Sequence, residues 1–380
     1  MNNVFDIIVI GAGIYGSSCS FFLKNTKNKV LLIEKGKAGS CGATSYSRGI
    51  TRVYDPDIEH SFQSYTSIID LLNWKENNYP GISPFNKSGF LYLLDEQKLP
   101  DLKNTFSFVD RNLYPMEILS QSKLLEKAPW IKNSKNKVGI YEKHGGYGNP
   151  ALTAANFVEG FLSKGGELYD NCTVQSIRST SADNWEVQLS EGVVKAKVVL
   201  MTAGALTNKI VENLPIHTRS ISLTHVATNK HKIDIPVVDE EIEVYVAPGS
   251  GLSFYTGSQK FEKTKFPEEL SKDSVKIIDN SMERLNRFLK PEINKNPINC
   301  IYGYDSYTEF KKPIVQFLPN NNGLYVATGF SGRGYKCCIS ISKSVAEEIN
   351  GYIDGKEMPN TVQWRYKLPS DHFAFNTTIL

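Results

Sequence analysis

The residues with the clearest chemical purpose stand near the start of the chain, where three glycines directly follow an apolar run. Gly11, Gly13 and Gly16 form a Gly-x-Gly-x-x-Gly pattern. In such a turn the first glycine permits a tight bend, the second lets the backbone approach a pyrophosphate, and the third lets the next helix pack closely on the strand. The first helical residues, Ile14 and Tyr15, then present N–H groups to phosphate oxygens.

A carboxylate follows at the distance that this chemistry requires. The second apolar run, Val30–Ile33, ends in Glu34, eighteen residues after Gly16. A side chain there can accept hydrogen bonds from the hydroxyls of a ribose. A tight turn without a ligand would explain the glycines but not the acid. The pattern therefore predicts a dinucleotide site, with Lys35 beside the acid as a further contact.

Glycine and hydroxyl residues fill the segment Gly39–Gly49. This composition is unfavourable for the interior of a helix, so we interpret the segment as a loop that wraps phosphates or a flavin ring. Ser45 and Ser47 are its candidate contacts.

Two arginines, Arg48 and Arg52, stand at and just after the end of this segment. The planar guanidinium group of an arginine can hold a carboxylate through two hydrogen bonds. The alternative is that one of them forms a surface ion pair with Asp55 or Asp57.

The spacing of apolar residues indicates which elements must position these side chains. Strands and helices alternate near the N-terminus, which predicts an α/β fold with a parallel sheet of the Rossmann type. Residues 216–260 alternate with period two in places, which is typical of an antiparallel sheet. Helices are predicted over residues 17–25, 60–74, 151–163, 268–289 and 339–352, and buried strands begin near 195 and 323.

Because the Rossmann elements come from the beginning, middle and end of the chain, we predict a discontinuous dinucleotide-binding domain. Its segments are residues 1–80, 146–215 and 300–380. A second α+β domain, for the substrate, is predicted to be built on an antiparallel sheet from residues 81–145 and 216–299.

The composition is that of an ordinary globular protein of 380 residues, long enough for two domains. Apolar residues make up 41% and charged residues 22%, and the net charge of +3 is too small to indicate a nucleic acid or a membrane surface as partner. No apolar run has the length of a membrane span, and no signal pattern precedes the first strand, so we expect a cytoplasmic protein. The six cysteines and six histidines lack the spacing of a disulfide framework or a metal site, and no metal is predicted.

In order along nearly the whole chain, these segments resemble the D-amino-acid oxidase superfamily of FAD-dependent oxidoreductases, and most closely its sarcosine oxidase and pipecolate oxidase branch. The resemblance implies FAD as the cofactor. Thr202–Ala205 is similar to the family's turn beside the flavin, Thr173–Ile177 to the strand on the adenine side, and Gly329–Lys336 to the C-terminal flavin turn. The contacts implied there are Val174, Ala203, Gly204, Gly332, Arg333, Gly334, Tyr335 and Lys336.

The resemblance also implies roles on the substrate side. Arg48 would contact the flavin, whereas Arg52 and Lys336 would hold the carboxylate of the substrate, although the spacing of the two arginines departs from that of sarcosine oxidases. Tyr245 and Tyr255 would form an aromatic cage over the flavin. The alternatives are a surface lysine and ordinary sheet tyrosines.

Cys300–Tyr302 is similar to the segment that tethers the flavin in the sarcosine oxidase branch. Cys300 is therefore a candidate for a covalent bond to FAD. The alternative is a thiol that packs as a small apolar side chain.

The chain departs from that branch at Ser253, which stands where the branch has a lysine that promotes reaction with oxygen. A nearby cation speeds this reaction by stabilising superoxide. Lys260, Lys263 or Lys265 would have to supply that charge, or another electron acceptor would be used.

Together these features imply an enzyme that oxidises the C–N bond of an amino acid or amine to an imine. A secondary, N-methylated or cyclic amino acid is favoured as substrate, with oxygen reoxidising the flavin to give hydrogen peroxide. Two alternatives stay open. One is a dehydrogenase for an amino acid or hydroxy acid that uses a quinone or another acceptor, and the other is a flavin-binding subunit without activity.

Overall fold

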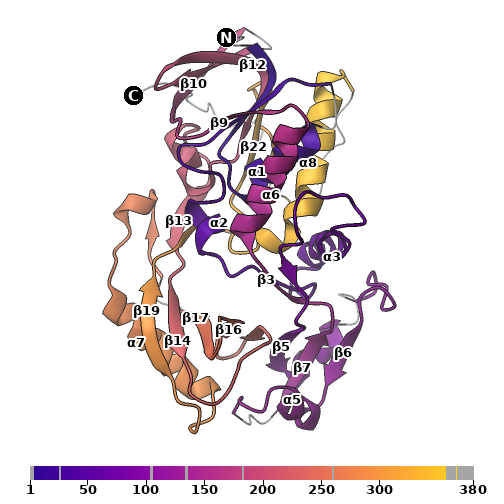
Figure 1. Cartoon of the computed structure of the whole chain (residues 1–380), viewed down its shortest axis with the longest axis vertical. Coiled ribbons are helices and arrows are strands. Elements are labelled where there is room, and N and C mark those ends of the chain that lie inside the picture. Colours follow the sequence, from indigo (N-terminus) through magenta and orange to yellow (C-terminus); the bar gives the residue numbers. More distant parts are fainter. Residues whose placement is uncertain are drawn as a thin grey trace.

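Two large sheets form the framework of the molecule, one in the upper and one in the lower half of Figure 1. The computed structural model describes residues 4–24, 27–102, 106–132, 136–181, 184–258, 261–356 and 365. Within these residues no helix has the length and apolar character needed to cross a bilayer. A sheet with parallel central strands and antiparallel strands at its sides, covered by helices, and a second sheet of mainly antiparallel strands confirm the predicted fold class.

The first sheet has β1 (Val4–Ile10) near its centre. It pairs in parallel with β12 (Gly192–Met201) and β2 (Val30–Ile33), and β12 also pairs in parallel with β22 (Leu324–Thr328). All residues of β2 and β22 are buried, as expected for parallel strands that are covered on both faces. The other strands of this sheet are β9 (Glu167–Tyr169), β10 (Val174–Ser181), β11 (Asn184–Leu189) and β21 (Ile314–Phe317).

Helices cover one face of this sheet. Ile7 and Val9 pack with them, whereas Ile8 and Ile10 point to the opposite face, in agreement with the period of two along a strand. The covering helices are α1 (Ile14–Leu23), α6 (Pro150–Ser163) and α8 (Cys338–Ile353), with α3 (Ile58–Leu72) beside α8.

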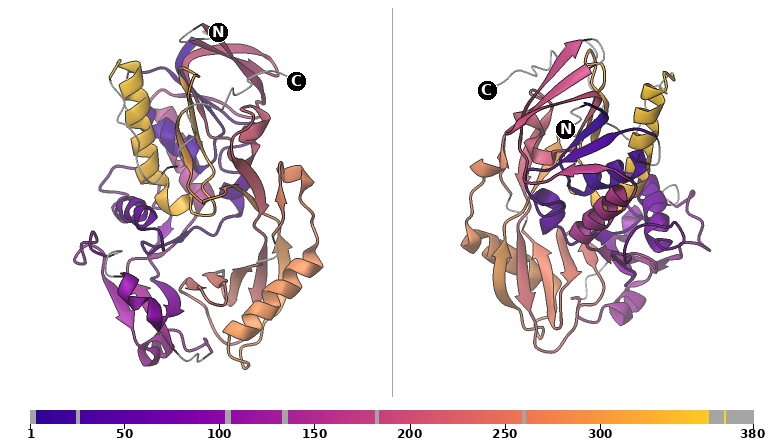
Figure 2. Two further views of the ribbon diagram at one scale, coloured as in Figure 1. Left: turned by 180° about the vertical axis from the view of Figure 1, so that it is seen from behind. Right: turned by 45° about the horizontal axis from the view of Figure 1, so that its top comes forward.

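The second sheet contains strands from the middle of the chain and from residues 90–142. Its neighbours are antiparallel except for one parallel pair, β5 with β15, so the sheet predicted to be antiparallel is mixed. In spatial order the strands are β19 (Asn296–Ile301), β14 (Leu223–Ala227), β17 (Ser253–Gly257), β16 (Val244–Pro248), β15 (Val237–Asp239), β5 (Phe90–Asp95), β7 (Lys137–Glu142) and β6 (Met116–Leu119). Helix α7 (Ser274–Phe288) packs on this sheet through Leu285 and Phe288 (Figure 2).

Short elements connect the two sheets. One small sheet contains β13 (Ile216–Ser220), β18 (Lys263–Thr264) and β20 (Tyr304–Thr308), and another contains β3 (Ile50–Thr51), β4 (Phe85–Asn86) and β8 (Gly146–Gly148). The short helices are α2 (Gly42–Tyr46), α5 (Gln121–Lys127) and the 3₁₀ helices η1 (Glu96–Asp101), η2 (Gly204–Lys209), η3 (Pro267–Glu269) and η4 (Tyr335–Cys337).

Two predicted elements differ from the observed ones. The segment 39–49 was expected to be a loop but contains α2, whose buried Thr44 accepts a hydrogen bond from the backbone N–H of Ile14 at 3.0 Å. Contact with the glycine turn therefore outweighs the low helix propensity of these residues. The predicted helix 268–289 starts later, at Ser274, because Asp273 caps it by accepting a hydrogen bond from the N–H of Lys276.

Glu142, the last residue of β7, ties the second sheet to the segment that follows Arg52. Its carboxylate accepts hydrogen bonds from the N–H groups of Val53 and Tyr54, at 2.7 and 2.8 Å, and from the hydroxyl of Tyr114 at 2.6 Å. The side chain is fully buried, and burial raises the pKa of Glu142 although these three donors oppose the rise. The position of residues 52–55 thus depends on this buried acid.

We expect Tyr114→Phe to lower the free energy of unfolding by about 1.5–3 kcal/mol, because it removes a donor from a buried charged acceptor. Urea denaturation measures the change. Tyr147→Phe is the matched control: its hydroxyl accepts a surface hydrogen bond from Asn86, and we expect a change below about 0.5 kcal/mol. Equal effects of the two substitutions would contradict this role of Glu142.

Candidate active site

A cavity of about 1150 Å³ runs from the glycine turn to the second sheet. It lies where the carboxyl ends of β1, β12 and β22 meet, the usual place for a ligand on a parallel sheet. Most residues proposed from the sequence line it: Gly11, Gly13, Ile14, Tyr15, Glu34, Lys35, Ser47, Arg48, Arg52, Val174, Ala203, Gly204, Tyr245, Gly332, Arg333, Gly334, Tyr335 and Lys336.

The glycine turn has the close contacts that the pattern predicts. Gly11 has a φ of 98°, and a Cβ atom on Gly16 would lie 1.7 Å from the carbonyl oxygen of Gly11. No side chain fits there, so α1 starts in direct contact with the turn. Gly16 lies behind the turn and is not part of the cavity wall.

Glu34 is held in place at the cavity by backbone N–H groups. Its Oε2 accepts a hydrogen bond from Ala12 at 2.7 Å and its Oε1 accepts one from Gly36 at 3.0 Å. Thr44, which the sequence did not single out, also lines the cavity. The N–H of Ile14 was expected to face a phosphate, but it donates its hydrogen bond to Thr44 Oγ1. The Thr44 hydroxyl is therefore the group that faces a ligand beside Ile14.

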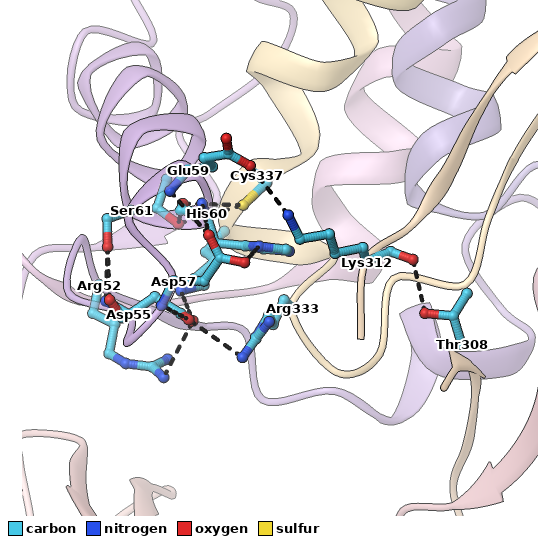
Figure 3. A network of polar contacts seen from close by, with 12 residues as sticks. Arg52, Asp55, Asp57, Glu59, His60, Ser61, Thr308, Lys312, Arg333 and Cys337 are labelled. Atoms are coloured by element: carbon cyan, nitrogen blue, oxygen red, sulfur yellow. Dashed lines mark hydrogen bonds and ion pairs between the residues drawn. The ribbon is translucent and has the colours of Figure 1, made fainter. Parts of the chain in front are cut away.

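Asp55 is the centre of a cluster of cations (Figure 3). Its Oδ2 lies 2.9 Å from the Lys336 ammonium and 4.0 Å from the Arg52 guanidinium, and its Oδ1 lies 3.3 Å from the Arg333 guanidinium. Burial alone would raise the pKa of Asp55, but these three cations hold it well below its usual value. A single carboxylate therefore forms ion pairs with three cations, and all three cations line the cavity.

This cluster excludes the surface alternatives for Lys336 and Arg52. Lys336 is only 2% exposed and donates to Asp55, so it is neither a surface lysine nor an unpaired cation. Arg52 pairs with Asp55 inside the protein rather than at the surface, and its guanidinium lies 5.5 and 5.4 Å from the rings of Phe90 and Tyr92. Both residues that were expected to hold the carboxylate of the substrate therefore belong to one cluster around Asp55.

The two candidate cage tyrosines occupy different places. Tyr245 lines the cavity, but Tyr255 does not. The Arg48 guanidinium lies 4.3 Å from the centre of the Tyr255 ring, which also stacks on His225 at 4.4 Å. Tyr255 therefore supports Arg48, which lines the cavity and forms no ion pair within the described part of the chain.

Cys300 and Ser45 also lie outside the cavity wall. Cys300 is on β19, opposite Thr224 of β14, and burial raises its pKa, which disfavours a nucleophilic thiolate. After Cys300, the next residue that lines the cavity is Gly303, three positions later. Ser45 donates a hydrogen bond to the carbonyl of Gly42 within α2.

The position that carries a lysine in the sarcosine oxidase branch has no cation here. The buried hydroxyl of Ser253 donates to the carbonyl of Ser250 at 2.8 Å. Lys265 lines the cavity, whereas Lys263 is exposed on β18. Lys260 lies outside the described residues.

Sequence reasoning missed two acids. Asp55 was considered only as a surface partner, and Asp305, which lines the cavity from β20, was not considered. The signal for Asp55 is its spacing of three residues from Arg52. Asp305 stands in the strand Tyr304–Thr308, and no local motif marks an acid there.

The residues present fit FAD. The cavity exceeds the roughly 300–1,000 Å³ of an ordinary small-molecule site, as a dinucleotide with a substrate requires. The glycine turn and the Glu34 carboxylate line this cavity, and so do the three cations of the Asp55 cluster and Tyr245. The site thus offers contacts for a pyrophosphate and a ribose together with a charged region for a second ligand.

Comparison with known proteins gives the same result. The chain is 22% identical to N-methyl-L-tryptophan oxidase of Citrobacter koseri over 91% of its own length and 95% of that protein, and 27% identical to peroxisomal sarcosine oxidase of Mus musculus over 90% and 91%. Its fold matches L-proline dehydrogenase of P. horikoshii with a TM-score of 0.81 at 20% identity, over 94% and 95% of the two chains. Residues 6–348 match the family described as FAD dependent oxidoreductase. The chain belongs to this family of FAD-dependent amine and amino-acid oxidoreductases.

Proposed function

We propose that the protein oxidises the C–N bond of an amino acid to an imine, with secondary, N-methylated or cyclic amino acids as favoured substrates. The observation that carries this proposal is the Asp55 cluster, in which three cations surround one carboxylate and line the same cavity as the glycine turn. The relatives are named for N-methyl-L-tryptophan, sarcosine and L-proline, two N-methylated amino acids and one cyclic one, which supports this substrate class.

The residues of the cavity would divide the work as follows. Arg52 and Arg333 orient the carboxylate of the substrate, and Lys336, held by Asp55, adds positive charge from behind. Tyr245 and Tyr307 confine the apolar part of the substrate and exclude water. FAD, when bound, supplies the oxidant for the two electrons and the hydrogen that leave the substrate carbon.

We propose oxygen as the acceptor that restores the oxidised cofactor, with hydrogen peroxide as product. Arg48 and Lys265 line the cavity and supply cations that could stabilise superoxide. A quinone or another carrier is the second candidate, favoured by the serine at position 253 and by the resemblance in fold to a dehydrogenase. This second enzyme would act on the same substrates.

Anaerobic mixing tests the reaction. We expect at least one of sarcosine, L-proline, L-pipecolate and N-methyl-L-tryptophan to bleach the visible absorbance of the bound flavin, because each combines a carboxylate with a secondary amine. The corresponding acids without nitrogen are the controls. Reoxidation by air and by an artificial dye then separates the two acceptors. The proposal fails if none of the four amino acids reduces the flavin.

Arg52→Ala should raise the KM for the amino acid about tenfold or more while FAD stays bound, since a charge-assisted contact contributes about 1.5–3 kcal/mol. Arg52→Lys should restore only part of the loss, because an ammonium group lacks the planar fork. Arg178→Ala, which breaks an exposed ion pair with Glu186, is the control and should leave KM unchanged. Steady-state kinetics with the best substrate measures all three. An unchanged KM in Arg52→Ala would argue against the carboxylate site.

Acid precipitation of the purified protein should release the flavin into the supernatant, because Cys300 lies outside the cavity wall. Cys300→Ser should therefore retain the same amount of FAD as the wild-type protein, measured by absorbance. Flavin that stays with the wild-type pellet but leaves that of Cys300→Ser would show that the thiol does form a bond.

A further inference from the structure

Asp305 places a carboxylate in the wall of the same cavity. Its Oδ1 accepts a hydrogen bond from the N–H of Ser306 and its Oδ2 one from the N–H of Gly332, both at 2.8 Å. These neutral donors fix the orientation of the side chain but do not neutralise it. Within the described residues, no lysine, arginine or histidine forms an ion pair with Asp305.

The charged groups nearest in the fold are directed elsewhere. Arg219 is the cross-strand partner of Asp305 on β13, but its guanidinium lies 3.4 Å from the Phe261 ring and 4.8 Å from the Tyr307 ring. Arg333, next to Gly332, points to Asp55.

Two of the described residues on which the charge of Asp305 acts are phenols. These are Tyr307 on its own strand and Tyr15 on α1, and burial raises the pKa of both, with a further rise from Asp305. Neutral phenols cannot balance a carboxylate. A partly buried carboxylate without a cation is unfavourable, so a cationic ligand would complete this part of the wall.

The C-terminal turn connects this acid to the cation cluster. Gly332 donates its N–H to Asp305, and the next residue, Arg333, reaches Asp55. A group that binds cations and a group that binds anions therefore lie on the two sides of one short turn. In an α-amino acid a single carbon atom separates the ammonium nitrogen from the carboxylate carbon. The two opposite charges of one small zwitterion therefore match the acid and the cation cluster in the cavity wall.

We propose that Asp305 binds the ammonium group of the substrate and thereby selects amino acids over hydroxy acids and carboxylic acids of the same shape. This inference takes its substrate class from the proposed function. It excludes the hydroxy-acid alternative, because a hydroxyl group carries no charge to balance Asp305.

The ionisation of Asp305 gives the selectivity a pH dependence. Burial raises the pKa of Asp305 to about 6, against the opposing effect of the Gly332 and Ser306 N–H groups. Above this pH the side chain is charged and attracts a cation, and below it the attraction is lost. Ligand ammonium groups stay protonated on both sides of this value.

Equilibrium binding tests the assignment without turnover. The probes are two pairs of isosteric ligands in which the carbon bonded to nitrogen carries no hydrogen: 2-aminoisobutyrate with 2,2-dimethylpropanoate, and 1-aminocyclopentanecarboxylate with 1-methylcyclopentanecarboxylate. Calorimetric titration of the FAD-loaded wild-type protein near pH 8 should show the amine member of at least one pair binding about tenfold more tightly. Asp305→Asn, which keeps an acceptor oxygen and the side-chain volume, should reduce that preference to below about threefold.

Asp110→Asn is the matched control, because Asp110 also accepts a backbone N–H, from Asn112, but is exposed and far from the cavity wall. It should retain the wild-type preference. In the wild-type protein the amine members should also bind more weakly as the pH falls from about 8 to about 5. This second readout does not depend on how well Asp305→Asn folds.

A preference that persists in Asp305→Asn, or a wild-type protein that does not distinguish the members of either pair, would overturn the assignment. The proposed function would still hold if an amino acid reduced the flavin in those proteins. Conversely, a preference that depends on Asp305 without any flavin reduction would support the amine site and contradict the proposed oxidation. The two failures are therefore distinguishable.

Discussion

The site depends on one buried carboxylate. Asp55 joins Arg52, from the first part of the chain, to Arg333 and Lys336 of the C-terminal turn. Three cations so close together would repel one another without it, and a buried charge is tolerated only when it is paired. The carboxylate is itself held by a hydrogen bond from the N–H of Asp57 at 3.1 Å. A substrate with a carboxylate thus meets a field that is already assembled when it arrives.

Contacts from both halves of the molecule hold the segments around Asp55 in place. Glu142 fixes the two residues before Asp55 from the second sheet. On the first sheet, the Tyr15 ring stacks on Phe330 at 3.6 Å, and its hydroxyl donates to the carbonyl of Gly334. The glycine turn that would hold the pyrophosphate and the turn that would hold the substrate are therefore in contact. In the proposed site, the same small group of side chains would set the positions of cofactor and substrate.

Local patterns in the sequence predicted the features that depend on local geometry. The glycine turn, the acid after the second strand, the helices 151–163 and 339–352 and the Rossmann-type fold follow from spacing and composition, whereas FAD was implied by the family resemblance, which the family assignment confirms. Apart from Arg52, three residues before Asp55, the partners of these buried charges do not follow from spacing. Asp55 and Asp305 are joined to residues more than twenty-five positions away, and a short motif contains no information about such pairs.

The same limit explains the other differences. The parallel pairing of β5 with β15 brings together strands more than 140 residues apart, and alternation within each strand indicates its faces but not the direction of its neighbour. Cys300 was assigned by similarity of three residues, whereas its place on an edge strand depends on the whole second sheet. Helix α2 forms because Thr44 meets the glycine turn, a contact outside its own segment.

Helix α1 is buried along its entire length, since every residue from Ile14 to Leu23 is covered. Its covering helices, α6 and α8, are made more than 120 and more than 300 residues later. On the ribosome, the residues of α1 therefore gain their first covering helix only when α6 has been made, and the second only when translation is nearly complete. Nascent chains of this kind expose aggregation-prone segments for a long time and rely on chaperones. The order of these elements along the chain thus makes synthesis a step at which apolar surface stays exposed.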